Sequence, residues 1–430
     1  MDLSRQVLHG SRMQNIDHEP QTTELSISQL DSIEQKITGE ENRPMSDEIN
    51  DDFMIDMPDI PMPNEEESSE VTDEFDAAFK FAFVGVGQGG SRIAEAFYKL
   101  GYRRVCAINT TNQDLTGINI PDSNKLVIGD GHGGAGKNPA NGAESAAKSY
   151  EDIYDVMRRS FGTDFDRIFV CIGAGGGTGS GAGEKVIEIA HEIAQSFKIE
   201  EAGGKPAVGV IVSMPKNSEG GKVNANAHVV LNSLFKMVGS DGGKLGGRTI
   251  SPLVIADNDR INKIYPKVPA SQFWDLANRN ISSLFHLFNT IAIKDSDFTT
   301  FDQADFKDIL DSGALTFGAC PIRKWDDPSD ISLAIRDNLK RNVLVGGFDL
   351  TQARTAGCVF IAHTSVLDVI PQESLEHGFE MLSRTMQKGS VVHRGIYKGN
   401  KEGLVVYSIL GELGRPDARL AEIAKIGNVT

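Results

Sequence analysis

The chain has 430 residues, enough for two ordinary domains, and a formal net charge of −17. Residues 1–76 contain 21 acidic and four basic side chains, so they carry the whole excess and the rest of the chain is neutral overall. An acidic segment on a neutral body argues against sequence-independent binding to nucleic acid. The sequence lacks an apolar run of bilayer length and the apolar core of a signal peptide, so we expect no membrane insertion and a cytoplasmic location.

Residues 1–76 are predicted to form a disordered acidic tail, because they have few aromatic residues and cannot bury enough apolar surface to fold. Within them, "SISQLDSIEQKI" (26–37) places Ile27, Leu30 and Ile37 at helical spacing. Two interpretations stay open: a solvated spacer, which the composition favours, or a short helix that binds an adaptor protein.

From residue 79 onward, short apolar runs alternate with amphipathic stretches, which predicts an α/β fold with a mostly parallel sheet covered on both faces. Ligands of such sheets bind at the carboxyl ends of the strands. The predicted strands are 81–86, 104–109, 125–129, 168–173, 207–214 and 252–257.

A long amphipathic helix is predicted over residues 270–293, with a second, smaller α/β domain after it. The apolar stripe of this helix consists of Trp274, Ala277, Ile281, Leu284, Phe288 and Ile291. In the second domain we expect strands near 313–322, 357–364, 390–398 and 403–412, and helices near 330–341 and 371–386.

No metal site is predicted within the protein itself. The four cysteines are far apart in the sequence and do not have the spacing of metal ligands. Three of them lie in apolar runs that are typical of strands, so buried free thiols in a reducing compartment are expected. The cysteines are Cys106, Cys171, Cys320 and Cys358.

The first glycine-rich loop, "GVGQGG" (85–90), fits the pattern of a dinucleotide-binding turn between a strand and a helix. Such a fold places an acidic residue at the end of the next strand to bind the ribose, and Asn109 stands there instead. The pattern alone therefore gives little support to a nicotinamide-dependent oxidoreductase.

The second loop, "CIGAGGGTGSGAG" (171–183), holds seven glycines and no lysine. Successive glycines let backbone N–H groups point inward, and a following helix, predicted to begin near Gly181, adds its positive end. Such a loop can bind polyphosphate without an ammonium group, with Thr178 and Ser180 as hydroxyl donors. Close packing is the alternative explanation, but it would require fewer glycines.

A third glycine-rich loop (129–139) follows the predicted strand 125–129 and contains Lys137, which can supply a positive charge. All three loops follow strands of one predicted sheet. We therefore expect them to converge on a single phosphate-binding pocket at the carboxyl ends of those strands.

These loops resemble the nucleotide-binding motifs of the tubulin/FtsZ superfamily. "GAGGGTGSGAG" resembles its signature loop, G-G-G-T-G-[ST]-G, and "GVGQGGSRIA", "AINTTNQDL" and "GGAGKNP" resemble its first three loops. "SMPKNSEGGK" resembles the segment that reaches the ribose, and "ADNDRI" the stretch before the central helix. The resemblance covers about residues 79–414.

The resemblance implies a Rossmann-like GTP-binding domain (77–268), a central helix (269–298), a smaller α/β GTPase-activating domain (299–414) and a short C-terminal tail (415–430). It implies GTP or GDP with Mg²⁺ as cofactors, and a head-to-tail homopolymer. The nucleotide-binding positions that it implies in the loops are Gly87, Gln88, Gly89, Gly90, Arg92, Asn109, Gln113, Ala135, Gly136, Lys137, Asn138, Gly175, Gly176, Gly177, Thr178, Gly179, Ser180, Glu219 and Asn258.

Trp274 and Asn278 are four residues apart, so they share one face of the central helix. In the family, an aromatic residue and an asparagine at this spacing stack on guanine and hydrogen-bond its edge. Core packing is the alternative role for Trp274. Arg92 departs from the family, which usually has Asn or Gln at this guanine-side position.

"TTFDQADFKDIL" (299–310) resembles the FtsZ loop N-V-D-F-A-D-V, with Asp302 and Asp305 at its two acidic positions. The resemblance implies that this pair polarises the attacking water in the neighbouring subunit of a polymer. Capping of the following helix is the alternative, and it would require only one of the two aspartates. Thr300 departs from the family, which has Asn there.

The leading hypothesis is a cytoplasmic GTPase that assembles into dynamic filaments and hydrolyses GTP at subunit contacts. Its role would be to position DNA or particles, as in plasmid-partition and phage-type members of the superfamily, or to act in division. The alternative is a GTP-binding scaffold that does not hydrolyse GTP and co-assembles with an active paralogue. A nicotinamide oxidoreductase is disfavoured, because no catalytic His or Cys lies near the expected pocket.

Overall fold

The computed structural model describes residues 75–429 except 131–132, 200–206, 239–248, 326, 342–343 and 388–389. The predicted acidic tail, with its helix-like stretch at 26–37, lies outside the described residues up to position 74.

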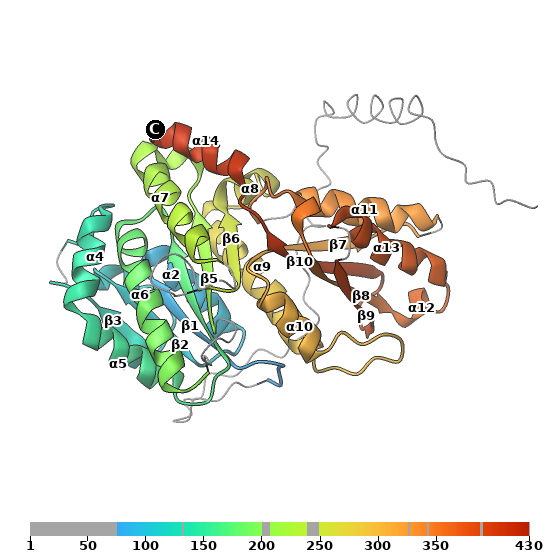
Figure 1. Cartoon of the computed structure of the whole chain (residues 1–430), viewed down its shortest axis with the longest axis horizontal. Coiled ribbons are helices and arrows are strands. Elements are labelled where there is room, and N and C mark those ends of the chain that lie inside the picture. Colours follow the sequence, from blue (N-terminus) through green and yellow to red (C-terminus); the bar gives the residue numbers. More distant parts are fainter. Residues whose placement is uncertain are drawn as a thin grey trace, which may run out of the picture. The chain divides into compact units, whose positions relative to one another are not determined.

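Ten strands form one sheet in the order β3-β2-β1-β4-β5-β6-β7-β10-β8-β9 (Figure 1). All neighbouring strands are parallel except for β10, which is antiparallel to both β7 and β8. This arrangement confirms the predicted α/β fold and its strands. The strands are β1 (Phe81–Val86), β2 (Val105–Asn109), β3 (Lys125–Val127), β4 (Arg167–Gly173), β5 (Val208–Met214), β6 (Leu253–Asp257), β7 (Ala314–Ile322), β8 (Thr355–His363), β9 (Val391–Gly399) and β10 (Leu404–Leu413).

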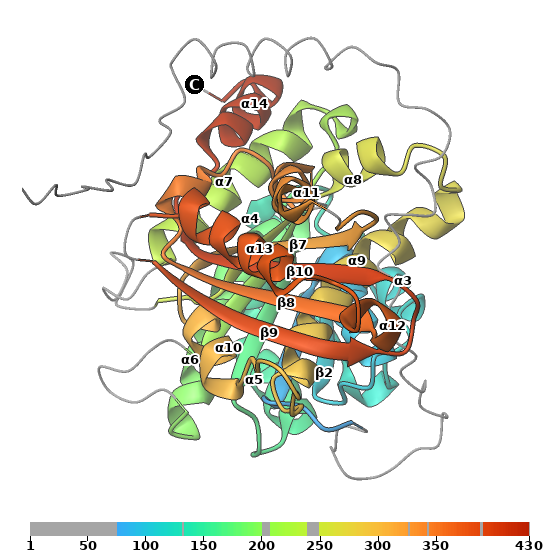
Figure 2. The same cartoon turned by 90° about the vertical axis from the view of Figure 1, so that its right-hand side faces the viewer.

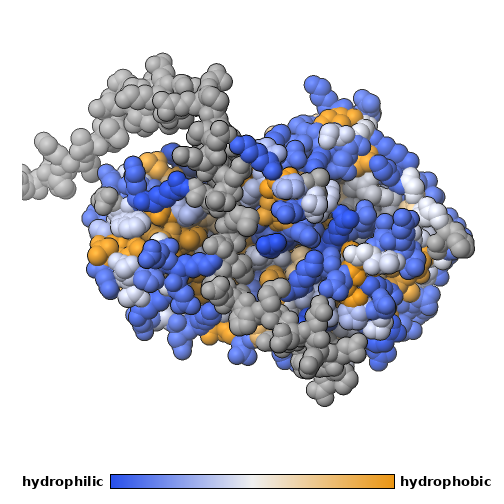
Figure 3. Space-filling view, turned by 180° about the vertical axis from the view of Figure 1, so that it is seen from behind, coloured by the Kyte–Doolittle hydropathy of each residue, from blue (hydrophilic) through white to orange (hydrophobic). Residues whose placement is uncertain are grey.

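Helices connect the strands and cover the sheet. They are α2 (Gly87–Lys99), α3 (Asn112–Thr116), α4 (Pro139–Lys148), α5 (Tyr150–Phe161), α6 (Gly177–Ser196), α7 (Gly221–Met237), α8 (Asn258–Ile264), α9 (Ala270–Ile291), α10 (Gln303–Leu310), α11 (Pro328–Arg341), α12 (Thr364–Leu367), α13 (Gln372–Thr385) and α14 (Asp417–Gly427). None of the helices in the described part of the chain could span a membrane. On the face seen in Figure 3, hydrophobic residues form separate patches between hydrophilic ones.

The central strands are buried on both faces, which is why they are nearly continuous apolar runs rather than alternating ones. Phe81 and Phe83 of β1 point into a core shared with α2, α9 and α10. Ala82 and Val84 point into the opposite core, formed with α5, α6, α7 and α14. A third core lies between the strands β7–β10 and the helices α11 and α13, which lie side by side in Figure 2.

The central helix α9 packs its predicted stripe into the first core. The stripe residues are buried except for Trp274, which is partly exposed. The sheet continues past this helix, because β6 pairs with β7 at Leu253↔Ala314 and Val254↔Leu315. The residues that follow the helix therefore share their sheet with the residues that precede it.

Residues 415–430, expected to be a short tail, contain α14, which lies along α7 (Figure 1). Leu420 and Ile423 of α14 are buried in the core that α7 also lines. Arg419, directly before Leu420, forms a buried ion pair with Asp257. The sequence did not reveal this packing, because the apolar stripe of the helix is short and its polar partner is more than 160 positions away.

A buried polar cluster fixes the segment before β1 to α9. The Asn289 side chain accepts a hydrogen bond from the Phe79 amide and donates one to the Phe79 carbonyl, each 2.9 Å long. It also donates to the Tyr102 hydroxyl, which lies 3.4 Å from Nδ1 of His286. His286 is completely buried, and this burial, with a smaller contribution from the charge of Lys294, lowers its pKa to about 4.

This cluster predicts a specific acid sensitivity. The unfolded chain binds a proton at His286 below about pH 6.5, whereas the folded chain does so only below about pH 4. Stability should therefore fall as the pH falls through this interval. Denaturant unfolding at pH 7.5 and 5.0 should show that the wild type loses about 2 kcal/mol more than His286→Gln. Equal losses in the two proteins would contradict a neutral, buried His286.

Candidate functional site

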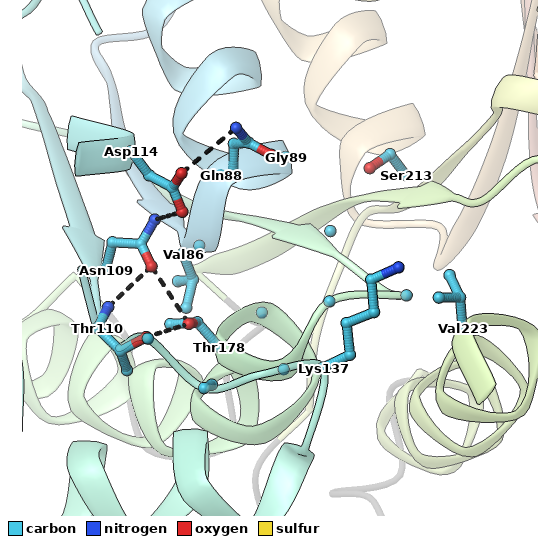
Figure 4. A pocket seen from close by; sticks show the side chains of 18 of the residues that line it. Val86, Gln88, Gly89, Asn109, Thr110, Asp114, Lys137, Thr178, Ser213 and Val223 are labelled. Atoms are coloured by element: carbon cyan, nitrogen blue, oxygen red, sulfur yellow. Dashed lines mark hydrogen bonds between the residues drawn. The ribbon is translucent and has the colours of Figure 1, made fainter. Parts of the chain in front are cut away.

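A pocket of about 420 Å³ opens at the carboxyl ends of the parallel strands. It is lined by residues at or directly after the carboxyl ends of β1, β2, β4, β5 and β6, namely Val86, Asn109, Gly173, Ser213 and Asn258. The three predicted glycine loops meet at this pocket (Figure 4). It therefore lies at the edge where a parallel α/β sheet binds its ligand.

In the first loop β1 leads directly into α2, because the strand ends at Val86 and the helix begins at Gly87. Gly87 has a φ of +71°, and a Cβ there would lie 2.9 Å from the Gly179 amide nitrogen. Gly87 and Gly89 line the pocket, whereas Gly90 does not. A Cβ on Gly90 would overlap the Cys171 carbonyl, so this glycine serves the close packing of α2 on β4.

The second loop leads from β4 into α6, which begins at Gly177 rather than near Gly181 as predicted. Its glycines have two different roles. A Cβ on Gly177 would lie 2.7 Å from the Ala135 Cβ, and one on Gly179 would overlap the Gly173 carbonyl oxygen. A Cβ on Gly176 would meet only this same oxygen, at 3.9 Å, so Gly176 borders open space in the pocket.

The N-terminus of α6 therefore faces the pocket with backbone N–H groups that have no partner inside the helix. These amides and the helix dipole favour an anionic ligand. Thr178 lines the pocket as predicted, but Ser180 does not. Its hydroxyl donates to the Ala174 carbonyl and closes the turn.

The third loop contributes Lys137 to the lining of the pocket (Figure 4). Gly136 and Lys137 have φ values of +58° and +56°. The Asn226 side chain, on α7, donates to the Lys137 carbonyl at 3.1 Å and to the Gly175 carbonyl at 3.2 Å, which joins the second and third loops. Asn138 does not line the pocket, because it caps α4 by accepting from the Ala140 amide.

A hydrogen-bonded polar cluster forms one wall of the pocket (Figure 4). The Asn109 amide group donates to Asp114 at 3.1 Å, and its oxygen accepts from the Thr110 amide and the Thr178 hydroxyl. The Thr110 and Thr178 hydroxyls are 2.7 Å apart. Asn109 and Thr178 were predicted from the sequence as site residues, but Thr110 and Asp114 were not, although both lie in the motif "AINTTNQDL".

Gln113, which the family resemblance implied as a contact, is exposed and lies outside the pocket. It occupies the first turn of α3, where its backbone amide donates to the capping Thr111 hydroxyl. The side chain that turns inward from this helix is Asp114, which receives a hydrogen bond from Gln88 at 3.4 Å.

Trp274 and Asn278 of α9 line the pocket together with Arg92 of α2. Asn278 is 9% exposed, and its side chain has no hydrogen-bond partner among the described residues. Its amide group borders the pocket and is not among the fully buried polar groups that lack a partner, so it is accessible to a ligand there. Trp274 packs edge-on against Phe273, at 5.1 Å between ring centroids.

On the side of β5 and β6, Glu219, which the resemblance implied as a nucleotide-binding residue, lines the pocket, and its carboxylate accepts from the Lys216 amide at 2.8 Å. The charged side chains of the lining are thus Arg92, Lys137, Asp114 and Glu219. All the predicted nucleotide positions line the pocket except Gly90, Gln113, Asn138 and Ser180.

Asp302 and Asp305 together form a capping box at the start of α10. The Asp302 side chain accepts from the Asp305 amide at 3.0 Å, and the Asp305 side chain accepts from the Asp302 amide at 3.1 Å. The expectation that capping would require only one of them is therefore wrong, because a capping box satisfies two helix-end amides reciprocally. Asp305 also lies 2.7 Å from Nδ1 of His393, on β9, a contact that the sequence did not reveal.

This acidic pair does not line the pocket of its own chain. Gln303 of α10 donates to the Ala78 carbonyl just before β1 at 2.6 Å, and Asp311 at the end of α10 pairs with Arg167 at the start of β4. Helix α10 thus lies at the amino ends of strands whose carboxyl ends form the pocket. Since a strand rises about 3.3 Å per residue, the six-residue β1 alone separates the two edges by about 20 Å.

The described residues contain no group of three or more His, Cys, Asp or Glu side chains arranged to hold a metal ion. The four cysteines are free, as predicted. Cys106, Cys171 and Cys358 are buried, which raises the pKa of each thiol. Burial also raises the pKa of Cys320, to about 11.

Two family models match the chain in sequence order. The GTPase domain of the tubulin/FtsZ family matches residues 80–240, and the C-terminal domain of TubZ-like tubulin/FtsZ-like proteins matches residues 288–419. Together they cover more than half of the chain.

Similar proteins include the tubulin-like protein TubZ of Bacillus cereus, 26% identical over 59% of this chain and 58% of its own length. The cell division protein FtsZ 1 of Pyrococcus woesei is 28% identical over 51% of this chain and 53% of its own. The chain thus matches little more than half the length of these relatives. A GTPγS-form protofilament of TubZ from Bacillus thuringiensis serovar israelensis shares the fold, with a TM-score of 0.70, 21% identity, and coverage of 82% of this chain and 92% of that one. The chain belongs to the tubulin/FtsZ family.

Proposed function

We propose that the chain binds GTP in this pocket, assembles head to tail, and hydrolyses GTP where the α10 edge of one subunit meets the pocket of the next. One observation supports this most: the pocket and the acidic pair lie at opposite edges of the same sheet. Stacking two copies along the strand direction brings the two together. Such a contact joins different surfaces and does not close on itself, so it generates an open filament.

The polyphosphate is assigned to the amides of the α6 N-terminus and of the passage into α2. Lys137, in the lining of the pocket, supplies the positive charge that the second loop lacks. Trp274 is assigned to the guanine face and the Asn278 side chain to its edge, which would give Asn278 the partner it lacks among the described residues.

The lining fits Mg²⁺ as a companion of the nucleotide. Mg²⁺ usually keeps several waters and is bound through phosphates and one or two protein oxygens, so it needs no dedicated carboxylate cage. The Asp114 carboxylate and the Thr110 and Thr178 hydroxyls are the oxygens available on the polar wall. When bound, the ion shares the negative charge of the phosphates.

For hydrolysis, Asp302 and Asp305 of the adjoining subunit are assigned to the attacking water. The capping box and the contact to His393 fix both carboxylates in advance, which favours one orientation of that water. The same contacts also give both aspartates a structural role that does not require catalysis. This observation, with Thr300 in place of the family asparagine, favours the second candidate: a GTP-binding scaffold that does not hydrolyse GTP and co-assembles with an active paralogue.

For the cellular role we propose a TubZ-like filament that positions DNA or particles, rather than a division ring. The support is the C-terminal match, which is to the TubZ-like domain. A protein adaptor that binds the acidic residues 1–76 would connect such a filament to its cargo.

Gly176→Ala tests the assigned phosphate site without disturbing the fold of the loop around it. The added methyl group meets no atom closer than 3.9 Å and enters the space assigned to phosphate, so the apo protein should unfold at the wild-type temperature. Its affinity for GTP should fall at least about 10-fold, equivalent to about 1.4 kcal/mol. Equilibrium binding of a fluorescent GTP analogue measures this. Gly117→Ala, where an added Cβ meets nothing within 4 Å and which lies outside the pocket lining, is the matched control and should bind normally.

Asp305→Asn tests hydrolysis. The amide oxygen can still accept from the Asp302 backbone, but the negative charge is lost. Phosphate release should fall about 100-fold or more, while pelleting shows that polymer still forms with GTP. Wild-type hydrolysis per subunit should rise with protein concentration, and Asp152→Asn, an exposed charge on α5, should behave as wild type.

Two results would decide against this proposal. Wild-type hydrolysis that is independent of concentration would remove the subunit contact from the mechanism. Wild-type protein that polymerises with GTP but releases no phosphate, alone or at any concentration, would establish the scaffold instead.

A further inference from the structure

Arg419 of α14 lies at the centre of a buried polar cluster next to the residues that line the pocket. The side chains of Arg419 and Asp257 are 8% and 4% exposed. Arg419 Nε donates to one Asp257 oxygen at 2.7 Å and Nη2 to the other at 3.1 Å. Nη1 donates to Asn217 and to Glu422, each at 2.8 Å. A planar guanidinium can serve these partners simultaneously, whereas an ammonium group cannot.

The partners of Arg419 belong to segments that line the pocket. Asp257 ends β6 and is followed by Asn258, a lining residue. Asn217 begins the 3-10 helix η2 (Asn217–Glu219), whose last residue also lines the pocket. Arg419 thus joins two pocket-lining segments that are about 40 residues apart in the chain.

Further hydrogen bonds close this cluster into a ring. The Asn217 amide donates to Asp259 of α8 at 3.1 Å, and its side chain donates to Glu422 of α14 at 2.7 Å. Asp257 caps α8 by accepting from the Asp259 amide at 3.1 Å. Therefore η2, the start of α8 and α14 hold one another, and a shift in one changes the bonds of the other two.

Packing of α14 against α7 adds a second connection to the pocket. A Cβ on Gly427, at the end of α14, would lie 2.8 Å from the backbone of Ala225. A Cβ on Gly221, the first residue of α7, would lie 3.2 Å from the Ile426 carbonyl oxygen. Between these two α7 positions lies Val223, which lines the pocket. The end of α14 therefore packs on the turn of α7 that borders the pocket.

We propose that Arg419 is a positioning residue for nucleotide binding and that α14 is energetically coupled to the pocket. Nucleotide binding holds η2 and Asn258 in place and so strengthens the docking of α14. By linkage, loosening α14 weakens nucleotide binding by the same factor. This inference rests on the proposed nucleotide binding. It also makes α14 a regulatory surface, because a partner that binds α14 and displaces it would change the affinity for nucleotide.

The test compares full-length wild type with Arg419→Lys, which keeps the charge but cannot bind Asp257 and Asn217 together. GDP is the probe, at protein concentrations below assembly. The Kd for a fluorescent GDP analogue should rise about 10-fold. Hydrogen exchange at the α14 amides should slow when GDP is added to the wild type and should not respond in the variant. Arg415→Gln, which removes an exposed arginine bound to Asn232, is the matched control and should keep both wild-type responses.

The outcomes separate this inference from the proposed function. Wild type that does not bind GDP or GTP would overturn both. If the wild type binds nucleotide and a folded Arg419→Lys binds it with the same Kd, only the coupling is overturned. An ion pair with a purely structural role would change the stability of the fold without changing the affinity for nucleotide. If Arg419→Lys does not fold, Asn217→Ala decides. It leaves the buried ion pair intact, and an unchanged Kd and unchanged α14 exchange response in this variant would overturn the coupling.

Discussion

The structure depends on a close approach of two backbone turns, from β1 into α2 and from β4 into α6. Gly87 lies against the amide of Gly179, and a Cβ on Gly89 would lie 3.2 Å from the Gly173 Cα. Any side chain at these contacts would force the strands or the helices apart. Because none is present, the two helix N-termini converge at one point, and their backbone amides form a site for an anion.

This convergence also explains why backbone amides and side chains line different parts of the pocket. Backbone amides occupy the inner surface, while side chains with charge or aromatic area, such as Lys137 and Trp274, come from loops and helices around it. Among the described residues that line the pocket, the only carboxylates are Asp114 and Glu219, and the acidic pair proposed for hydrolysis is not among them. Asp302 and Asp305 are fixed at the other edge of the sheet, so the proposed reaction requires a second molecule.

One continuous sheet joins the part of the chain before α9 to the part after it. The strand β7 pairs with β6 on one side and β10 on the other, so the parts of the chain before and after α9 share hydrogen bonds as well as a core. The last helix, α14, returns to the first part and joins η2 and the β6 end through Arg419. The proposed pocket is therefore held by segments from most of the length of the described chain.

The α/β fold, its ten strands and the glycine-rich loops could be predicted from the amino-acid sequence, because apolar runs and glycine turns are local signals that need no distant partner. Thr178 followed from the glycine-rich loop that contains it, whereas the family resemblance implied Asn109 and Trp274 as nucleotide contacts. Tertiary structure decided what depends on distant partners: Gly90 packs on Cys171, Asp305 meets His393, and Arg419 pairs with Asp257. It also decided that the residues of α14 form a packed helix, since a helix with so few buried residues is stabilised by its contacts with α7 and by that ion pair rather than by its own sequence.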